Sequence, residues 1–240
     1  MKSIVSRRKI IAGVAATSLL SIAGLAGAQD KPKLRLSTPA SASDQRAVAM
    51  STIFGPAVAE FATFEPHWNA ELFKQGTELE AISRGNLEMS IASAQELAEF
   101  FPEFSIFASA YLHRDAAHQK KVFEADLFKP FKKMVEDKLG VKLLSVMYLG
   151  RRQLNLRTDK KINTPEDLAG VKLRMPGSES WMFMGRALGA NPTPMAFTEI
   201  YTGLQTGAID GQDNPLPTDK DAKFYEVTKQ VVLTSHLVDG

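Results

Sequence analysis

The sequence of 240 residues contains no cysteine. This absence excludes disulfide bonds, thiolate metal sites and cysteine nucleophiles. Disulfides are needed mainly by small exported domains with little core, and a chain of this length has no such need. The sequences G-x-S-x-G, G-x-x-x-x-G-K and G-x-G-x-x-G are also absent, so the common serine hydrolase, P-loop and dinucleotide-binding motifs are excluded.

The four histidines predict no metal site. His113 and His118 are five positions apart, so they do not share a helical face, and no acidic residue completes a metal-binding spacing. His67 and His236 are isolated in the sequence. We therefore predict no catalytic residue, no metal and no cofactor, and we predict that the chain is not an enzyme.

Charge is missing from residues 10–28. A basic stretch precedes this run, and the small-x-small sequence Ala26-Gly27-Ala28 ends it. The pattern predicts a cleaved signal peptide over residues 1–28, rather than a membrane anchor, and hence a periplasmic protein. Ser6-Arg7-Arg8-Lys9 resembles a twin-arginine signal, but ordinary signals also carry such pairs, so both export routes stay open.

The mature chain is nearly neutral. Four of the 29 basic residues and none of the 27 acidic residues lie in the first 28 positions. The remainder holds 25 basic and 27 acidic residues, a net charge of −2. The basic pI of the whole sequence therefore belongs largely to the leader, and neither nucleic acid nor an acidic lipid surface is predicted as a partner.

Alternating strand and helix signals predict an α/β fold with a largely parallel sheet. The predicted strands are residues 33–36, 87–92, 141–147 and 171–175, with an extended piece at 192–195. The predicted helices are residues 45–54 before Gly55-Pro56, 78–84 after a capping box at Thr77, 116–139 with a break near Pro130, 165–169, 180–188 and 198–206. A turn is predicted at Gly211–Pro215.

Residues 171–215 carry the strongest functional signal. They combine two strand–helix units, an arginine at the end of a strand and an Asn-Pro pair. Alternation along the strand places Leu173 and Met175 on one face and Arg174 on the other. A guanidinium presents two parallel N–H donors that match a carboxylate, so this segment predicts an anion-binding site.

Three motifs in this order and spacing resemble a known family. They are L-R-x-P at 173–176, P-T-P-M-A-F at 192–197 and Q-x-N-P at 212–215. The sequence resembles the substrate-binding proteins of tripartite ATP-independent periplasmic (TRAP) transporters, of the dicarboxylate or DctP type, from about Lys33 to the end. The resemblance implies a two-lobed, type II-like periplasmic-binding-protein fold that closes about a hinge over an organic acid.

The resemblance also implies a domain plan and partners. The first lobe would span residues 29–149, the second lobe residues 150–236, and residues 237–240 would begin a return to the first lobe. Members of the family continue well beyond this point, so we expect the C-terminal part of the fold to be missing. The implied partners are the organic acid and the small and large membrane subunits of the transporter, with the binding protein a monomer.

Site residues follow from the same resemblance. Arg174 would clamp the ligand carboxylate, Asn214 would be its polar partner, and Arg152 would be a second arginine, with Arg151 as a register-shifted rival. Further candidates around the ligand are Trp181, Ser93 and Gln95. Four of these predictions have a plain structural alternative: Arg174 as a solvent-facing strand residue, Asn214 as a turn residue, Arg151 and Arg152 as a solvated loop pair, and Trp181 as a core residue.

The function that we expect is the capture of an organic acid and its delivery to a membrane permease. A periplasmic sensor subunit for a signalling receptor would use the same pocket and stays open as an alternative. A hydrolytic enzyme would need a triad or metal site, which the sequence does not display. The identity of the acid also stays open, because a dicarboxylate, sugar acid, keto acid or aromatic acid would each satisfy one arginine clamp.

Overall fold

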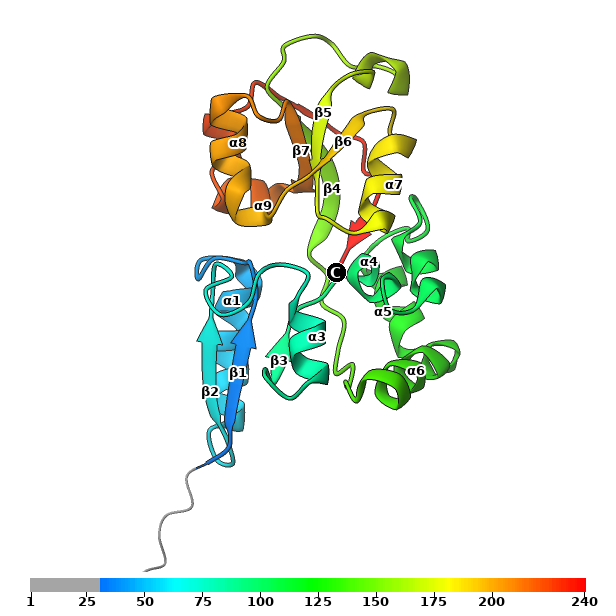
Figure 1. Ribbon diagram of the computed structural model, residues 1–240. Coiled ribbons are helices and arrows are strands. Elements are labelled where there is room, and N and C mark those ends of the chain that lie inside the picture. The colour runs from blue at the N-terminus through cyan, green and yellow to red at the C-terminus, as the bar shows by residue number, and fades with distance from the viewer. Residues whose placement is uncertain (1–30) are drawn as a thin grey trace, which may run out of the picture. The chain divides into compact units, whose positions relative to one another are not determined.

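Two sheets organise the computed structural model, which describes residues 31–240. The predicted signal peptide, residues 1–28, lies outside the described residues. Within Lys33–Gly240, the first sheet has the order β2-β1-β3 and the second the order β6-β5-β7-β4-β8, with β9 also paired to β4 (Figure 1). The strands are β1 (Lys33–Ser37), β2 (Thr63–His67), β3 (Met89–Ser90), β4 (Gly150–Leu156), β5 (Lys172–Met175), β6 (Asn191–Pro194), β7 (Gly211–Pro215), β8 (Gln230–Val232) and β9 (Val238–Asp239).

The predicted α/β class is confirmed, but the prediction of a largely parallel sheet holds only in part. In the first sheet, β1 is parallel to both neighbours. In the second sheet β5 is parallel to β6 and β7, whereas β4 is antiparallel to β7, β8 and β9. Helical crossovers connect the parallel strands, as right-handed β-α-β units require, while β4 enters the sheet from the opposite direction.

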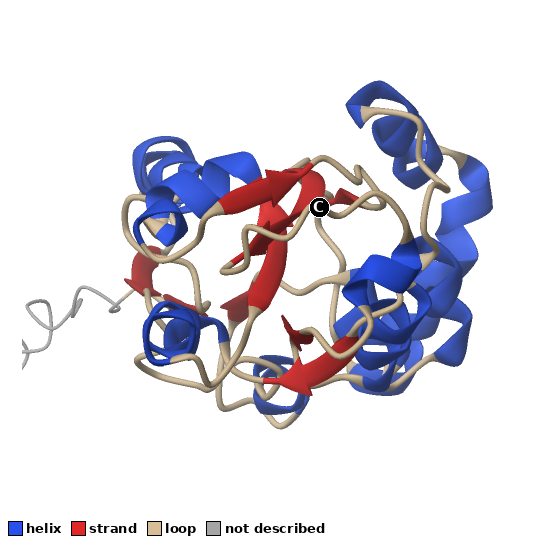
Figure 2. Cartoon of the chain, turned by 90° about the horizontal axis from the view of Figure 1, so that it is seen from above, coloured by secondary structure: helices blue, strands red, loops and turns tan. Residues whose placement is uncertain are grey.

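Helices lie around the strands (Figure 2). In Figure 1, α7 lies on one side of the second sheet and α8 and α9 on the other. The helices are α1 (Gln45–Ala49), α2 (Gly55–Val58), α3 (Glu78–Ser83), α4 (Ala94–Ala98), α5 (Ala116–Glu124), α6 (Lys129–Leu139), α7 (Glu179–Ala187), α8 (Ile200–Thr206) and α9 (Leu216–Asp221). Single 3₁₀ segments cover Pro102–Ala108, Asp126–Phe128, Pro165–Leu168, Phe197–Glu199 and Phe224–Glu226.

The part of the chain that contains the first sheet is called the first region, and the part that contains the second sheet is called the second region. Burial of apolar side chains produces a separate core in each. Phenylalanine side chains from the 3₁₀ segment Pro102–Ala108, from α5 and from α6 pack against one another, as with Phe107 and Phe131, which meet edge to face at 4.8 Å between ring centroids. The second sheet buries Leu173 and Met175 against α7. The predicted alternation of β5 is therefore confirmed, and Arg174 extends from the opposite face.

The helix predicted to stop at Gly55-Pro56 continues through it, so the prediction of a break was wrong. A π-helical turn over Met50–Phe54 joins α1 to α2, and Pro56 lies in the first turn of α2. Proline removes one N–H and crowds the carbonyl four residues earlier, and a widened turn at that point accommodates both effects. At α3, Thr77 occupies the N-cap position, but its side chain makes no capping hydrogen bond.

Two other local predictions were wrong. Residues 141–147 form no strand: no described strand pairs with them, and the Leu144 side chain is 66% exposed. An apolar run becomes a strand only where another strand completes its hydrogen bonds. Gly211–Pro215 is the central strand β7 rather than a turn, because it pairs with both β4 and β5.

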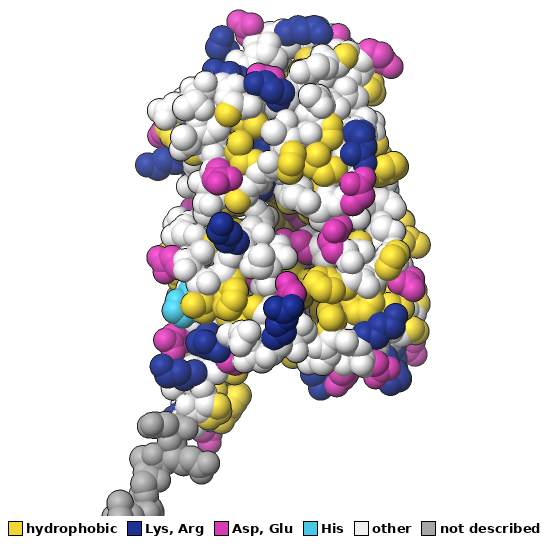
Figure 3. All heavy atoms as spheres, in the orientation of Figure 1, with side chains coloured by type: hydrophobic (Ala, Val, Ile, Leu, Met, Phe, Trp, Pro, Cys, Tyr) yellow, Lys and Arg dark blue, Asp and Glu magenta, His cyan; other side chains and the backbone are white. Residues whose placement is uncertain are grey.

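No helix within residues 31–240 has both the length and the apolar character needed to cross a bilayer. Basic and acidic side chains alternate over the face seen in Figure 3. This mixture agrees with the near-neutral charge of the mature sequence.

Two glycines with left-handed backbones allow a test of the packing of the C-terminal end of α7 against Pro165. Gly189 follows α7 with φ 91°, and a methyl group there would lie 2.2 Å from the Pro165 carbonyl oxygen. Gly140 follows α6 with φ 66°, and a methyl group would meet no atom within 4 Å. We expect Gly140→Ala to lower the free energy of unfolding by about 1 kcal/mol and Gly189→Ala by about 1–3 kcal/mol more, measured by urea denaturation. Equal losses in the two variants would contradict the packing at Pro165.

Candidate functional site

A cavity of about 90 Å³ lies where the ends of β5 and β7 meet the region of the first sheet. Ligands of α/β proteins bind at the carboxyl ends of sheet strands, where side chains from several loops converge. Residues from both regions line this cavity, including Thr38, Arg46, Gln75, Ser93, Glu96, Arg152, Arg174, Trp181, Asn214, Thr218 and Asp239. The cavity therefore brings together polar groups from positions far apart in the sequence.

Arg174 is the most deeply placed charge at the cavity, with 1% of its surface exposed. Its Nε donates to the Met195 carbonyl oxygen at 2.8 Å, and its Nη2 donates to Gln75 Oε1 at 3.1 Å. Within residues 31–240 its Nη1 donates no hydrogen bond to the protein. Burial, with Arg152 nearby, lowers the pKa of Arg174 to about 9. The guanidinium is thus oriented, and an anion would stabilise its charge.

Arg152 lines the same cavity but is already paired with carboxylates. Its Nε lies 2.6 Å from Asp213 Oδ2, and its Nη1 donates to Asp239. Its guanidinium carbon lies 4.4 Å from the centroid of the Trp181 ring. Arg152 and His236, which contacts Asp213 at 3.1 Å, hold the pKa of the Asp213 carboxyl well below its usual range despite burial. The arrangement braces β4, β7 and β9 beside the cavity.

Asn214 has an amide group oriented by a relay of hydrogen bonds. Its Nδ2 donates to Gln212 Oε1 at 2.6 Å, and Gln212 Nε2 donates to Asp219 Oδ1 at 2.9 Å. Asp219 also accepts from Asn155, and burial raises the pKa of Asp219 to about 7. Because Asn214 lies in β7 beside Arg174 in β5, its side chain completes the polar end of the cavity.

The remaining predicted residues divide between the cavity and other places. Trp181 is buried at the cavity, and Ser93 lines it while capping α4. Gln95 is buried elsewhere, outside the cavity lining. Arg151 is exposed and donates to the Arg114 carbonyl, since its position in β4 faces away from that of Arg152. Of the two arginines, Arg152 is the one at the cavity.

Sequence reasoning missed six polar residues of the cavity: Thr38, Arg46, Gln75, Glu96, Thr218 and Asp239. Glu96 carried a signal, because the Ser93-x-x-Glu96 spacing is a capping box, and the structure contains that box. Gln75 lies in a loop between β2 and α3, and no motif or periodicity in the sequence indicated it. Its place beside Arg174 depends on the packing of one region against the other.

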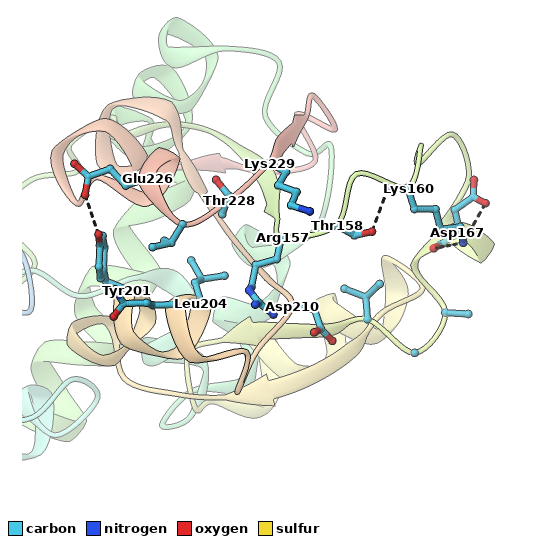
Figure 4. Close-up of a pocket in the computed structure, with 15 residues that line it drawn as sticks. Arg157, Thr158, Lys160, Asp167, Tyr201, Leu204, Asp210, Glu226, Thr228 and Lys229 are labelled. Atoms are coloured by element: carbon cyan, nitrogen blue, oxygen red, sulfur yellow. Dashed lines mark hydrogen bonds and ion pairs between the residues drawn. The ribbon is translucent and has the colours of Figure 1, made fainter.

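A second, larger depression of about 790 Å³ is a weaker candidate (Figure 4). Tyr201 and Glu226 are joined there by a hydrogen bond of 2.8 Å, and Lys160 lies 3.7 Å from Asp167. Its charged groups are largely exposed and partly paired with one another, so the depression lacks the buried arginine that makes the smaller cavity a candidate anion site. No group of three or more metal-ligating side chains occurs among residues 31–240.

The likeness to known proteins agrees with this geometry. The family model of the bacterial extracellular solute-binding proteins, family 7 (DctP), matches residues 60–240. The chain belongs to this family. The predicted resemblance is confirmed, and the DctP family consists of solute-binding proteins of the periplasm rather than enzymes.

Similar proteins include one sequence relative and two solved structures. The sialic acid-binding periplasmic protein SiaP of Vibrio cholerae is 33% identical over 71% of this chain and 53% of its own. A TRAP periplasmic solute-binding protein from Roseobacter denitrificans with bound 3-deoxy-D-manno-oct-2-ulosonic acid is 68% identical, with a TM-score of 0.86. That alignment covers 88% of this chain and 70% of the other. The sugar acid-binding protein of Advenella mimigardefordensis, in complex with galactonate, is 26% identical, with a TM-score of 0.80 over 88% of this chain and 68% of its own.

These matches confirm the predicted two-lobed α/β fold. This DctP family member spans about half the length of the curated relatives it matches.

The Arg152–Asp213 pair leads to a stability prediction. Asp213→Ala leaves Arg152 buried with one carboxylate instead of two, and we expect a loss of about 3–5 kcal/mol in the free energy of unfolding at pH 7. Because the folded protein holds the pKa of Asp213 below its ordinary value of 3.8, the loss persists down to about pH 4 and shrinks only at lower pH. Asp159→Ala, which removes an exposed partner of Lys229, is the control and should change little. Urea denaturation at pH 7, 5 and 3 measures both variants.

Proposed function

We propose that the protein captures an organic acid in the cavity at Arg174 and delivers it to a TRAP-type membrane permease. The observation that carries this proposal is the buried guanidinium of Arg174, oriented by Met195 and Gln75, with no hydrogen bond from Nη1 to any residue of 31–240. A carboxylate at that edge would accept parallel N–H donors and would neutralise a charge that burial has made costly. Asn214 would add an amide at the same end of the ligand.

The solved relatives support a carboxylate ligand. The Roseobacter and Advenella proteins were crystallised with 3-deoxy-D-manno-oct-2-ulosonic acid and galactonate, both of which are carboxylic acids. The first of them is 68% identical to this chain. In the proposed function Arg174 binds the carboxylate, while Arg152 supports the cavity wall through Trp181 and Asp213.

We propose that the lobes follow the boundaries expected from the sequence, at 29–149 and 150–236, with residues 237–240 returning toward the first lobe. The backbone contact from Leu149 N to the Asp239 carbonyl at 2.9 Å supports this, because it joins the two crossing segments. Rotation about these segments would close the cavity over a ligand. The membrane subunits of the permease would then recognise the closed form, with the binding protein a monomer in the periplasm.

Replacing the clamp tests the binding role. Arg174→Lys keeps the positive charge but loses the planar pair of donors, so we expect the affinity for 3-deoxy-D-manno-oct-2-ulosonic acid or galactonate to fall about 10- to 100-fold. Arg186→Lys, at an exposed arginine paired with Glu179, is the matched control and should bind normally. Isothermal titration calorimetry measures both. Equal affinity in the Arg174 variant and the control would refute the clamp.

The pKa of Arg174 leads to a prediction for pH. Burial lowers the pKa of the Arg174 guanidinium to about 9 in the ligand-free protein, whereas a bound carboxylate would favour the protonated form. Affinity should therefore be constant between pH 7 and 8 and weaken about tenfold by pH 10, with uptake of a proton on binding. Titrations in two buffers of different ionisation enthalpy measure that uptake. Constant affinity to pH 10 would show that the Arg174 guanidinium keeps its proton without the acid, contrary to this prediction.

A further inference from the structure

Thr218 has a buried hydroxyl group that makes no hydrogen bond within residues 31–240. The residue lies in the first turn of α9 with 3% of its surface exposed, and its Oγ1 makes no hydrogen bond in the structure. A buried hydroxyl without a partner costs free energy, and such groups in native proteins are few. The same side chain lines the cavity that contains Arg174.

Other helical threonines in this protein show how the chain ordinarily satisfies such a hydroxyl. Thr206 donates to the Thr202 carbonyl at 2.8 Å, and Thr52 donates to the Val48 carbonyl at 2.7 Å. Each bond reaches the residue four positions earlier, within or next to the helix. At Thr218 the residue four positions earlier is Asn214, which lies in strand β7, so this local solution is absent. The Thr218 hydroxyl at the cavity wall therefore lacks the kind of hydrogen bond that Thr206 and Thr52 make.

Glu96 is the counterpart from the first region. Its Oε2 accepts from the backbone and the hydroxyl of Ser93, at 2.8 and 3.1 Å, while Oε1 accepts no hydrogen bond within residues 31–240. Burial raises the pKa of the Glu96 carboxyl, although Ser93 and Arg174 act in the opposite direction. A carboxylate at the cavity wall accepts hydrogen bonds from ligand hydroxyl groups and repels a second ligand carboxylate.

We propose that Thr218 and Glu96 form a hydroxyl-binding subsite that selects polyhydroxylated monocarboxylates and rejects dicarboxylates. This inference rests on the proposed function, because Arg174 must first fix the ligand carboxylate at the other part of the cavity. The Arg174 clamp and the facing carboxyl group of Glu96 then distinguish the two ends of the ligand, because the other carboxylate at the cavity, Asp239, is already paired with Arg152. Specificity between organic acids follows from the subsite, whereas affinity for the carboxylate follows from Arg174.

The experiment compares three acids by isothermal titration calorimetry: galactonate, hexanoate and succinate. Galactonate and hexanoate share a six-carbon monocarboxylate chain, but only galactonate carries hydroxyl groups. The wild-type protein should bind galactonate at least tenfold more tightly than succinate. Thr218→Val, which is nearly isosteric, should lower the affinity for galactonate about tenfold and leave the affinity for hexanoate within twofold of the wild-type value. Thr218→Ser should retain binding, and Thr198→Val, at an exposed threonine, is the control.

The stability of the ligand-free protein separates a binding role from a structural one. Replacing an unsatisfied buried hydroxyl by a methyl group should leave the melting temperature of Thr218→Val unchanged or raise it. Glu96→Gln removes the repelling charge and should raise the affinity for succinate relative to galactonate at least tenfold. A lowered melting temperature with equal losses for galactonate and hexanoate would overturn the subsite.

Two outcomes separate this inference from the proposed function. If the wild-type protein binds succinate through Arg174 but does not prefer galactonate, the subsite is refuted and the acid-binding function stands. If it binds none of these acids nor 3-deoxy-D-manno-oct-2-ulosonic acid, the proposed function fails and the subsite with it. Unchanged galactonate affinity in Thr218→Val refutes the subsite alone.

Discussion

The burial of two arginines within one small cavity wall is the constraint on which this structure depends. Moving a guanidinium out of water is costly, and two like charges near each other add to the cost. The protein neutralises Arg152 with Asp213 and Asp239 and stacks it on Trp181. It gives Arg174 only neutral acceptors, the Met195 carbonyl and the Gln75 amide. One arginine is therefore part of the framework, and the other retains capacity for an external anion.

The antiparallel strand β4 makes this division possible. Its pairing with β7 places Arg152 opposite Pro215 and next to Asp213, while the parallel pairing of β5 with β7 places Arg174 next to Gln212. Asp239 reaches Arg152 because β9 pairs with the first residues of β4. Three segments that are distant in the sequence thus meet at the end of one sheet. A ligand at this point would contact groups held by backbone pairing rather than by mobile loops.

The two regions contribute unlike chemistry to the cavity. The second sheet supplies Arg152, Arg174 and Asn214, whereas α4 supplies Glu96 and the loop before α3 supplies Gln75. The Oε1 atom of Gln75 accepts two hydrogen bonds, one from Arg174 Nη2 and one from the Phe197 backbone N–H at 2.8 Å. Contacts of this kind couple the position of one region to the other, and they are the bonds that any opening movement would have to break. Binding and closure would therefore share the same residues.

The sequence by itself determined the family, the α/β class and the alternation of β5, and it predicted Arg174 as a site residue, because these depend on local periodicity and on motifs with fixed spacing. It also indicated Asn214, although as part of a turn rather than of a central strand. Only the tertiary structure decided that Arg152 rather than Arg151 lies at the cavity, that Arg152 is neutralised by Asp239 from 87 positions away, and that Gln75, Glu96 and Thr218 line the same space. The physical reason is the same in each case. Strand pairing and the packing of one region against the other set these distances, and neither leaves a periodic signal in the amino-acid sequence.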